Sequence, residues 1–288
     1  MILTRLKGGL GNQMFQYATG LEMATRYNEI LKLDATGYDD ERHVKSDTPR
    51  KYRLFPFAIS GEVAPLDEVM KIRNPYGFFS RLVRAFSQKV LRKYHIDYEP
   101  DYFNKKRTYV EGFFQSEKNF STVKDRIRQE FTLKKEYESP AFLDAKKMVA
   151  KKNSVSVHIR RGDYANHTLT NSYFGTCSKE YYLKAIAYIS SKVENPTFYF
   201  FSDDIEWAKK EFGESSTYNY ISNPALQDYE ELILMSLCSH NILANSSFSW
   251  WSAWLNNNPS KIIIAPKKWL NVVPDPQPNI VPETWIRL

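Results

Sequence analysis

Cysteine is scarce in this sequence of 288 residues, which has only Cys177 and Cys238. Two cysteines are too few for a disulfide-stabilised scaffold, and their spacing matches no metal-binding motif. Disulfides are also rare in reducing compartments. We therefore expect two reduced thiols in a cytoplasmic protein.

Long apolar runs are missing as well. No stretch approaches the roughly 18 consecutive apolar residues that a membrane-spanning helix needs. The first residues, MILTRLKGG, are not followed by the apolar segment of a signal peptide. A secreted or membrane-spanning protein is therefore not expected, and we predict a cytoplasmic location.

An excess of acidic residues is also absent, since 40 Lys and Arg outnumber 33 Asp and Glu and the net charge is +7. Such a balance favours anionic partners, among them nucleotides, nucleic acids and acidic lipids. A nucleic-acid binder needs a continuous basic face. Here the basic residues are interspersed with carboxylates and no binding motif is present, so we do not expect a nucleic-acid partner.

The N-terminal region lacks the GxGxxG fingerprint of dinucleotide-binding folds, although it contains a glycine-rich turn. Residues 1–6 are predicted to form a strand, residues 14–26 a helix and residues 30–35 a second strand. Between the first strand and the helix lies GGLGNQ, residues 8–13. This order of strand, glycine turn, helix and strand is typical of an α/β layer.

Two interpretations of the glycine turn remain open. Gly8, Gly9 and Gly11 would let the backbone approach a ligand closely. Asn12 and Gln13 would then face that ligand as hydrogen-bonding amides. The alternative is a tight turn that only begins the helix.

Strands and helices alternate regularly from residue 154 to residue 266. This alternation predicts a parallel sheet with right-handed crossovers. The expected strands are 154–159, 198–202, 218–221, 240–245 and 261–266, and the expected helices are 179–191, 205–212, 228–238 and one beginning near 247. We predict a first α/β domain over residues 1–153 and a second, Rossmann-like domain over residues 154–288. The proline-rich tail, 274–282, is expected to be extended and is a candidate for packing back on the first domain.

Polar side chains follow three of these strands, where ligands bind in open parallel sheets. They are Arg160 and Arg161, then Ser202, Asp203 and Asp204, then Asn245, Ser246 and Ser247. Two adjacent guanidiniums repel each other unless they share an anion, and a diphosphate matches their planar forks. The alternative is a pair of surface arginines, each with its own carboxylate.

The two aspartates do not form a metal-binding DxD motif, because they are adjacent and alternate faces. Asp204, just before the helix at 205–212, is a good N-cap candidate. The side chains of Trp250, Trp251 and Trp254 are expected to pack their helix against the rest of the protein rather than to stack on a sugar.

The segment 78–94, FFSRLVRAFSQKVLRKY, has apolar residues at helical spacing and five basic residues. A basic amphipathic helix of this kind can lie on an anionic membrane surface. The alternative is that its apolar face packs on its own domain. The first interpretation would make the protein peripheral at the inner face of the cell membrane.

Four motifs together resemble glycosyltransferase family 11, the alpha-1,2-fucosyltransferases. They are GGLGNQMFQYA at 8–18, VHIRRGDY at 157–164, FFSDDIEW at 200–207 and NSSFSWWSAWL at 245–255, and EGFFQSEKNF at 111–120 is also similar to a family segment. The resemblance implies a GT-B-type fold of two Rossmann-like domains facing across a cleft. It also implies GDP-fucose as donor, a galactose-type hydroxyl of a glycan as acceptor, inversion at the anomeric carbon and no obligatory metal or other cofactor. The chain resembles the bacterial members, which work on surface-polysaccharide or lipopolysaccharide intermediates.

The resemblance also suggests roles for individual residues. Arg160 would be the main contact of the diphosphate and would stabilise the leaving group, with Arg161 helping or holding the loop. Asp163, also expected to be catalytic, would orient an arginine or contact the sugar. Asp203 would contact the guanine base. His158 would contact guanine or hold the loop. The other expected donor-binding residues are Ser202, Asp203, Asn245, Ser246 and Ser247, and the expected residues on the acceptor side are Gly9, Asn12, Gln13 and Gln115. The candidates for a general base are Asp163, Glu111 and His167.

Other functions are kept as alternatives. One is a fucosyltransferase of another linkage, or a related transferase that uses a different nucleotide sugar. Another is a non-catalytic module that binds a GDP-sugar. The motifs spread over both predicted domains favour an enzyme.

Overall fold

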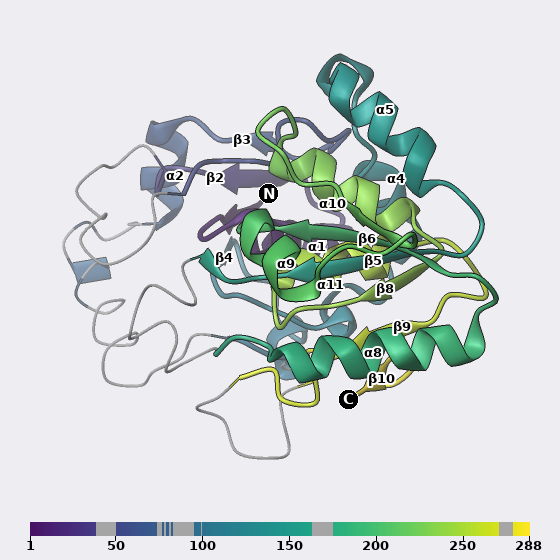
Figure 1. The fold of residues 1–288 in the computed structure, drawn as a ribbon. Helices are drawn as coiled ribbons and strands as arrows, with labels where there is room; N and C mark the ends of the chain where they lie inside the picture. Colours follow the sequence, from purple (N-terminus) through teal and green to yellow (C-terminus); the bar gives the residue numbers. More distant parts are fainter. Residues whose placement is uncertain are drawn as a thin grey trace. The chain divides into compact units, whose positions relative to one another are not determined.

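The computed structural model describes residues 1–38, 50–73, 77, 79–80, 82, 95–98, 100–162, 175–270 and 279–288. Within them the chain forms two compact units, Met1–Thr132 and Leu133–Leu288. Each unit is built around its own parallel β-sheet (Figure 1).

The first unit contains a four-stranded sheet in the order β3-β2-β1-β4. Its elements are β1 (Ile2–Arg5), α1 (Leu10–Arg26), β2 (Leu31–Asp34), β3 (Glu62–Val63), α2 (Leu66–Arg73), the 3-10 helix η2 (Pro100–Phe103), β4 (Tyr109–Val110), the 3-10 helix η3 (Glu117–Phe120) and α4 (Lys124–Glu130). Helix α1 packs closely on β1 because Gly20 has no side chain: a Cβ there would lie 2.1 Å from the Thr4 hydroxyl oxygen. Val69 of α2 packs with Leu3 of β1.

Two elements of the first unit differ from the sequence prediction. Helix α1 begins at Leu10 rather than at residue 14, because the carbonyl of Gly9 already accepts hydrogen bonds from the N–H groups of Asn12 and Gln13. The sequence TYVEGFF, residues 108–114, predicts a longer strand, which the structure reduces to β4. There the chain turns away because Phe114 has a φ of 53° and donates its N–H to the carbonyl of His95.

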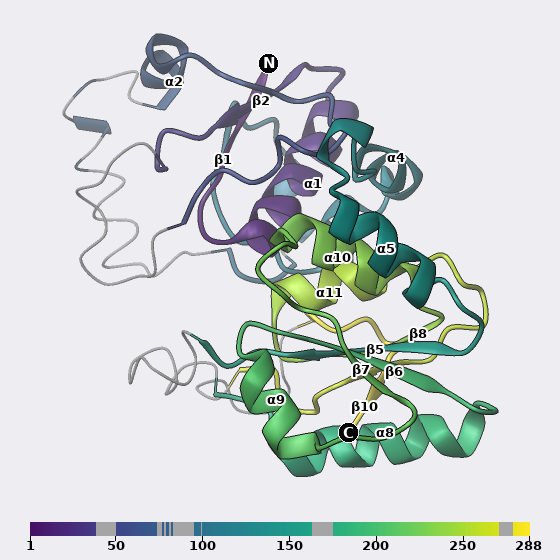
Figure 2. The same ribbon diagram turned by 45° about the horizontal axis from the view of Figure 1, so that its top comes forward.

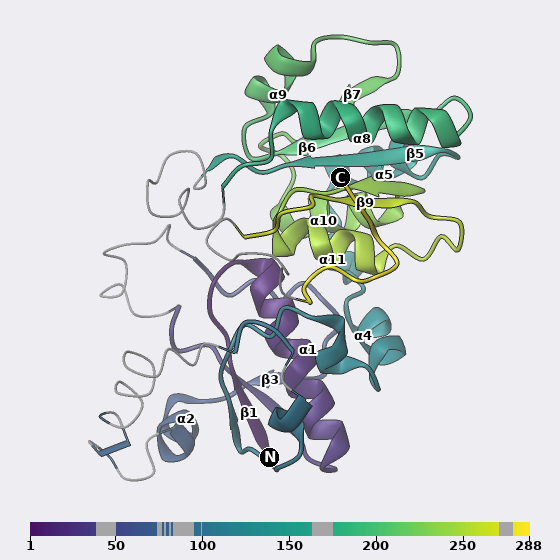
Figure 3. The same cartoon turned by 90° about the horizontal axis from the view of Figure 1, so that it is seen from below.

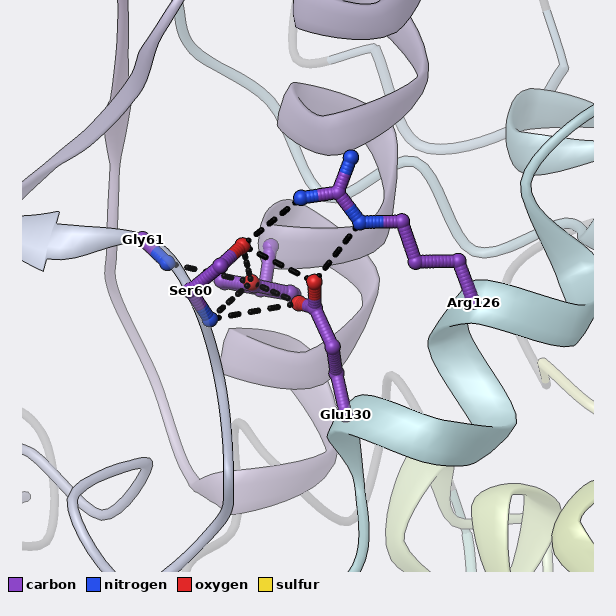
Figure 4. Close-up of polar contacts among 5 residues, drawn as sticks. Ser60, Gly61, Arg126 and Glu130 are labelled. Atoms are coloured by element: carbon purple, nitrogen blue, oxygen red, sulfur yellow. Dashed lines mark hydrogen bonds and ion pairs between the residues drawn. The ribbon is translucent and has the colours of Figure 1, made fainter.

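A buried carboxylate ties α4 to α1 in the first unit (Figure 4). Glu130 is 8% exposed and accepts hydrogen bonds from the hydroxyl of Tyr17, the hydroxyl of Ser60 at 2.8 Å and Nε of Arg126 at 2.8 Å. Nη2 of Arg126 also donates to the Ser60 hydroxyl at 2.9 Å. Because both carboxylate oxygens accept hydrogen bonds, the free-energy cost of burying this charge is compensated. We therefore interpret the cluster as structural.

The second unit contains a six-stranded parallel sheet in the order β10-β9-β8-β5-β6-β7. Its elements are η4 (Lys135–Tyr137), α5 (Pro140–Val149), β5 (Ser154–Ile159), α8 (Lys179–Lys192), β6 (Thr197–Ser202), α9 (Ile205–Phe212), β7 (Tyr218–Tyr220), α10 (Asp228–Leu237), β8 (His240–Ile242), α11 (Ser247–Leu255), β9 (Ile263–Ala265) and β10 (Ile286–Arg287). Helices α8 and α9 cover one face of the sheet, and α5, α10 and α11 lie on the other (Figures 2 and 3). This is the doubly wound arrangement that the alternation predicted.

Side chains of β5 alternate between these two layers. Val155 and Val157 belong to a buried cluster with Tyr182 and Ala185 of α8 and Ala208 of α9. On the other face, the hydroxyl of Ser156 accepts a hydrogen bond from the amide of Asn241 at 2.8 Å. Both faces of the strand are therefore buried, as expected for a central parallel strand.

The tryptophans of α11 are core residues, as predicted. Trp250 and Trp251 are fully buried and Trp254 is 4% exposed. The rings of Trp250 and Trp285 lie 5.5 Å apart, and the Trp250 indole N–H donates to the carbonyl of Ile280 at 2.6 Å.

The described part of the proline-rich tail, residues 279–282, lies within the second unit. Strand β10 pairs with β9, and Ile280 accepts the Trp250 hydrogen bond. Residues 271–278 lie outside the described part of the chain.

The unit boundary differs from the predicted domain boundary at 153/154. Residues 133–153 belong to the second unit, because α5 packs on α10 and the backbone N–H of Ser139 donates to Glu230 at 2.7 Å. The hydroxyl of Tyr199 in β6 also donates to the carbonyl of Met148 at 2.8 Å. These contacts are long-range in sequence, so local patterns did not reveal them.

The basic helix predicted over residues 78–94 falls almost entirely outside the described residues. Of this segment, Phe79 is 73% exposed and Leu82 is 49% exposed. Within the described ranges, no helix is both long and apolar enough to cross a membrane.

Candidate functional site

The strand order of the second unit defines where a ligand is expected. β6 and β7 follow β5 on one side, whereas β8 and β9 lie on its other side. The order therefore reverses at β5, and ligands of doubly wound sheets bind outside the carboxyl ends of the strands at such a switch point. The predicted polar residues after β5, β6 and β8 all fall at this edge.

Arg160 and Asp203 form an ion pair at this edge. Strands β5 and β6 are in register with Ile159 opposite Ser202, so the residues that follow each strand meet. Nη1 of Arg160 lies 2.9 Å from Oδ2 of Asp203, and the Arg160 and Asp203 side chains are 23% and 24% exposed. Oδ1 of Asp203 accepts the backbone N–H of Arg161 at 2.9 Å. Asp203 thus fixes the chain after β5 as well as the Arg160 side chain.

The side chain of Arg161 contacts a different set of residues. Its guanidinium carbon is 3.8 Å from the centre of the Trp207 ring, and its Nε is 3.9 Å from Oδ2 of Asp204. Asp204 is the N-cap of α9, as predicted, and its Oδ1 accepts the N–H of Trp207 at 3.1 Å. The two adjacent arginines are therefore separated, one on Asp203 and the other on α9.

His158 is buried, 4% exposed, two residues before Arg160 on the same face of β5. Its ring centre lies 5.4 Å from that of Phe248, at the start of α11. Burial, aided by the charge of Arg160, lowers the pKa of His158 to about 3, so the imidazole is neutral at physiological pH. Its Nδ1 has no hydrogen-bond partner among the residues that the structure describes. A neutral imidazole with a free nitrogen is suited to a neutral polar ligand group.

Glu231, in the first turn of α10, belongs to the same edge but was not predicted from the sequence. The backbone N–H of Ser202 donates to the Ser222 hydroxyl at 2.9 Å, and Ser222 hydrogen bonds to Glu231. Burial raises the pKa of Glu231 to about 7, and the nearby carboxylates of Asp228, Asp203 and Glu230 add to the rise. A carboxyl group with a strongly raised pKa beside a predicted binding edge is a functional candidate. The acidic start of α10, DYEE, was the only sequence signal, and helix starts are often acidic without any ligand.

The residues after β8 have structural contacts of their own. The Asn245 amide donates to the carbonyls of Gly175 and Trp269, at 3.2 and 3.3 Å, and its oxygen accepts from the thiol of Cys177. Ser246 is the N-cap of α11, with its hydroxyl accepting the N–H of Phe248 at 3.3 Å. Ser247 is the first residue of that helix. Backbone N–H groups at a helix start are suited to a phosphate. The Asn245 side chain ties together the segments that carry Gly175, Cys177 and Trp269.

The predicted acceptor-side residues lie where β1 leads into α1. The amide of Gln115 donates to Oδ1 of Asn12 at 2.7 Å, so the structure brings these two side chains together. Gln13, in contrast, is fully buried: its amide donates to the carbonyls of Gly8 and Lys51 and its oxygen accepts from the Arg53 N–H. The expectation that Gln13 faces a ligand is therefore wrong, because all its hydrogen-bonding groups stabilise the turn.

Glu111, one of the candidates for the general base, is paired in the first unit. Its Oε1 lies 2.5 Å from Nη1 of Arg5, at the carboxyl end of β1. The ammonium of Lys7 lies 4.6 Å from the centre of the Phe113 ring, and burial lowers the pKa of Lys7. The other two candidates, Asp163 and His167, lie outside the described residues.

The two cysteines are free thiols. Burial raises the pKa of Cys177 to about 11, which makes it unreactive at neutral pH. Among the described residues, no group of three or more His, Cys, Asp or Glu side chains is placed to hold a metal ion.

Comparison with known proteins identifies relatives along the whole chain. The model of a family described as glycosyl transferase family 11 matches residues 49–286. An alpha-1,2-colitosyltransferase of Escherichia coli is 35% identical over 303 residues, which cover 100% of this chain and 99% of that protein. The O-antigen biosynthesis glycosyltransferase WbnK of Escherichia coli is 29% identical over 98% of this chain and 99% of its own length.

Solved structures share the fold at low sequence identity. The fucosyltransferase NodZ of Bradyrhizobium superposes with a TM-score of 0.53 and 13% identity, over 88% of this chain and 92% of NodZ. POFUT1 in complex with GDP-fucose gives a TM-score of 0.51 and 13% identity, over 91% of this chain and 97% of POFUT1. Together with the two parallel sheets, this likeness confirms the predicted α/β fold of the GT-B type.

Proposed function

The chain belongs to glycosyltransferase family 11, and on this premise we propose that it is an inverting alpha-1,2-fucosyltransferase. The donor is GDP-fucose and the acceptor is a galactose-type hydroxyl of a glycan. The observation that carries the proposal is the Arg160–Asp203 ion pair at the switch point of the second sheet. It places a fixed guanidinium where the diphosphate of a nucleotide sugar is expected.

The reaction needs positive charge next to the β-phosphate of the leaving group. The acceptor oxygen attacks the anomeric carbon, the bond from that carbon to the β-phosphate oxygen breaks, and its electron pair stays on the departing GDP. The hydroxyl proton passes to a general base, for which Asp163, Glu111 and His167 remain the candidates. Arg160, oriented in advance by Asp203, stabilises the charge that grows on the β-phosphate. Ser246 and Ser247 at the start of α11 support the same group.

The guanine base is assigned to His158 and Glu231. Both oxygens of Asp203, which the sequence favoured for the base, are engaged by Arg160 and by the N–H of Arg161. The carboxylate of Glu231 can accept from the two adjacent N–H groups on the Watson–Crick edge of guanine, which adenine does not present. His158, whose neutral Nδ1 has no hydrogen-bond partner among the described residues, is the second candidate for a contact with the base. These contacts would select GDP over other nucleotides.

We expect Glu231→Gln to weaken GDP binding about 10- to 100-fold, the typical worth of a hydrogen bond to a charged group. The same change should raise the melting temperature at pH 8. The folded-state pKa of about 7 lies above the unfolded value of 4.5, so the protonated form stabilises the fold, and this contribution is lost as the pH rises through 7. Below about pH 4.5 the two proteins should melt alike on this account.

Calorimetric titration with GDP and thermal melts at several pH values would measure both effects. Glu206→Gln is a matched control, since Glu206 is an exposed carboxylate on α9 that pairs with Lys209 at 2.7 Å. A Glu231→Gln protein that melts higher at pH 8 but binds GDP like the wild type would show that Glu231 is a buried acid without a role in binding.

The function itself is tested with a panel of nucleotide sugars and a galactose-terminated acceptor in the presence of EDTA. We expect GDP release and fucosylated product from GDP-fucose, with EDTA causing no loss because no metal is required. NMR of the product should show an α-1,2 linkage. GDP binding without transfer would instead indicate a non-catalytic module.

A second candidate donor is GDP-colitose. It is favoured by the 35% identity with an alpha-1,2-colitosyltransferase over the full length of both chains. Colitose is L-fucose without its 3-hydroxyl group, so a single hydroxyl distinguishes the two donors. Side-by-side kcat/KM values for GDP-fucose and GDP-colitose decide between them. A site that binds the 3-hydroxyl should reject the deoxy sugar strongly, because its polar partner would be left unsatisfied.

The acceptor is proposed to be an intermediate of surface polysaccharide or lipopolysaccharide synthesis, handled in the cytoplasm. The support is the similarity to an O-antigen biosynthesis glycosyltransferase. Contact with the inner face of the membrane through residues 78–94 remains part of this proposal, on the strength of five basic residues and no acidic residue in that segment.

A further inference from the structure

The Arg161 guanidinium is stacked on an aromatic ring beside the proposed diphosphate site. Its central carbon lies 3.8 Å from the centre of the Trp207 ring, well within the range of a cation–π contact. The Arg161 side chain is 28% exposed, and its Nε is buried without a hydrogen-bond partner among the described residues. The indole face, together with the Asp204 carboxylate whose Oδ2 lies 3.9 Å from Nε, therefore holds this end of Arg161.

Trp207 is itself held firmly. It lies in the first turn of α9, where Asp204 caps its N–H at 3.1 Å. Its ring meets that of Phe212 at 6.3 Å in a T-shaped arrangement, and it packs against the buried cluster between the sheet and α8. A rigid indole on a capped helix is a fixed surface for a planar guanidinium.

The stack is coupled to Arg160 through the backbone. The N–H of Arg161 donates to Oδ1 of Asp203, whose Oδ2 binds Arg160. Arg161 is thus fixed at its backbone by Asp203 and at its side chain by Trp207. The loop after β5, by which we mean residues 160–162, therefore has two anchors, and Arg160 projects from it.

Gly162 shows how closely the backbone after Arg161 approaches the Asp203 side chain. A Cβ on Gly162 would lie 2.6 Å from Oδ2 of Asp203, the oxygen that binds Arg160. Small movements of the loop would therefore displace the carboxylate that orients Arg160.

We propose that Trp207 is a positioning residue for sugar transfer: by stacking on Arg161 it fixes the loop after β5 and so holds Arg160 in the geometry that stabilises the leaving diphosphate. This inference rests on the proposed function, because it assigns Arg160 to the diphosphate. It also assigns the two arginines different roles, since Arg161 acts through the loop and Arg160 acts on the phosphate.

The test uses four variants: Trp207→Leu, Trp207→Phe, Arg161→Met and the double variant Trp207→Leu/Arg161→Met. We expect Trp207→Leu and Arg161→Met each to lower kcat and GDP affinity about 3- to 30-fold, the range of a partly buried cation–π contact. Trp207→Phe, which keeps an aromatic face, should restore most of both. The double variant should be no worse than the worse single variant, because both changes remove one contact.

Arg107→Met is the matched control. The Arg107 guanidinium lies 4.3 Å from the centre of the Tyr102 ring in the first unit, so the variant removes a similar stack that has no link to Arg160. Its kcat should equal that of the wild type. Melting temperatures separate positioning from general destabilisation: Arg161→Met should lose activity while melting within a few degrees of the wild type.

Wild-type kcat and GDP affinity in Trp207→Leu would overturn the inference, and so would multiplicative losses in the double variant. If Trp207→Leu does not fold, Arg161→Met and Trp207→Phe still decide the matter through the same two measurements. Failure of the proposed function has a different signature, because the wild type would then transfer no sugar from any GDP donor. In that case the GDP affinities alone test whether the stack positions Arg160.

Discussion

Replacing Arg160 with alanine should lower kcat about 100- to 1000-fold, the usual cost of losing a fixed charge-stabilising group. Arg160 is the guanidinium that Asp203 orients at the carboxyl end of β5, where the strand order reverses. In the transition state it would face the growing charge of the β-phosphate. The loss should therefore appear mainly in kcat, with a smaller rise in the donor KM.

The Arg160→Ala protein should remain folded. The partner that it leaves behind, Asp203, is 24% exposed, so water can solvate its carboxylate, and Asp203 still accepts the N–H of Arg161. Circular dichroism and thermal melts check this, and steady-state GDP release measures the rate. Arg160→Lys keeps the charge without the planar fork and should recover only part of the activity. Full activity in Arg160→Ala would remove Arg160 from the mechanism.

Much of the second unit could be predicted because its signals are local. The apolar run of β5 was predicted with both of its ends, and α9 was bounded by an Asp204 cap and by Gly213, whose φ is 69°. The order of strands and helices then implied a parallel sheet, and the polar strand ends marked its binding edge. These inferences needed only hydrophobic periodicity and turn chemistry.

The partners of the site residues could not be predicted, because they depend on strand pairing. Asp203 binds Arg160, 43 positions earlier, only because Ile159 lies opposite Ser202 in the sheet. Glu231 joins the same edge through Ser222 and the packing of α10. No spacing in the sequence shows these contacts, so the sequence indicated neither the pairing of Asp203 with Arg160 nor the place of Glu231 at this edge.

The first unit was harder to predict, because its elements are short and irregular. Strands β3 and β4 have two residues each, too few for an alternating pattern. The start of α1 carries a glycine cap with no side-chain hydrogen bond, so it lacks the usual Ser, Thr, Asp or Asn signal. The sequence suggested that the Gln13 side chain is available to a ligand. In the structure its amide donates to the carbonyl of Lys51 and its oxygen accepts from the N–H of Arg53, which are distant in sequence.

Replacing Trp250 with alanine should cost about 3–5 kcal/mol in the unfolding free energy of the second unit, the range for removing a large buried aromatic side chain. Trp250 is fully buried, and its ring lies 5.0 Å from that of Trp251 and 5.5 Å from that of Trp285. The change also leaves the carbonyl of Ile280 without its indole donor. Trp250→Phe keeps an aromatic ring but not the N–H, and should cost less.

Urea unfolding followed by circular dichroism and tryptophan fluorescence measures this loss, with Leu183→Ala as control. Leu183 is 45% exposed on α8, so its removal should change stability by less than about 0.5 kcal/mol. An unchanged midpoint in Trp250→Ala would contradict the packing that the structure assigns to α11.

Trp250 also links packing to donor binding, because α11 begins with the residues proposed to support the diphosphate. A ligand that binds only the folded protein adds about 2.7 kcal/mol of stability at a concentration 100 times its Kd. GDP at such a concentration should therefore offset a large part of the Trp250→Ala loss, provided that the variant still binds it. Adenosine diphosphate, which lacks the guanine edge assigned to Glu231, should not. A midpoint that GDP raises and adenosine diphosphate does not would show that the variant still binds the donor, so that Trp250 acts on the packing of α11 and not as a donor contact.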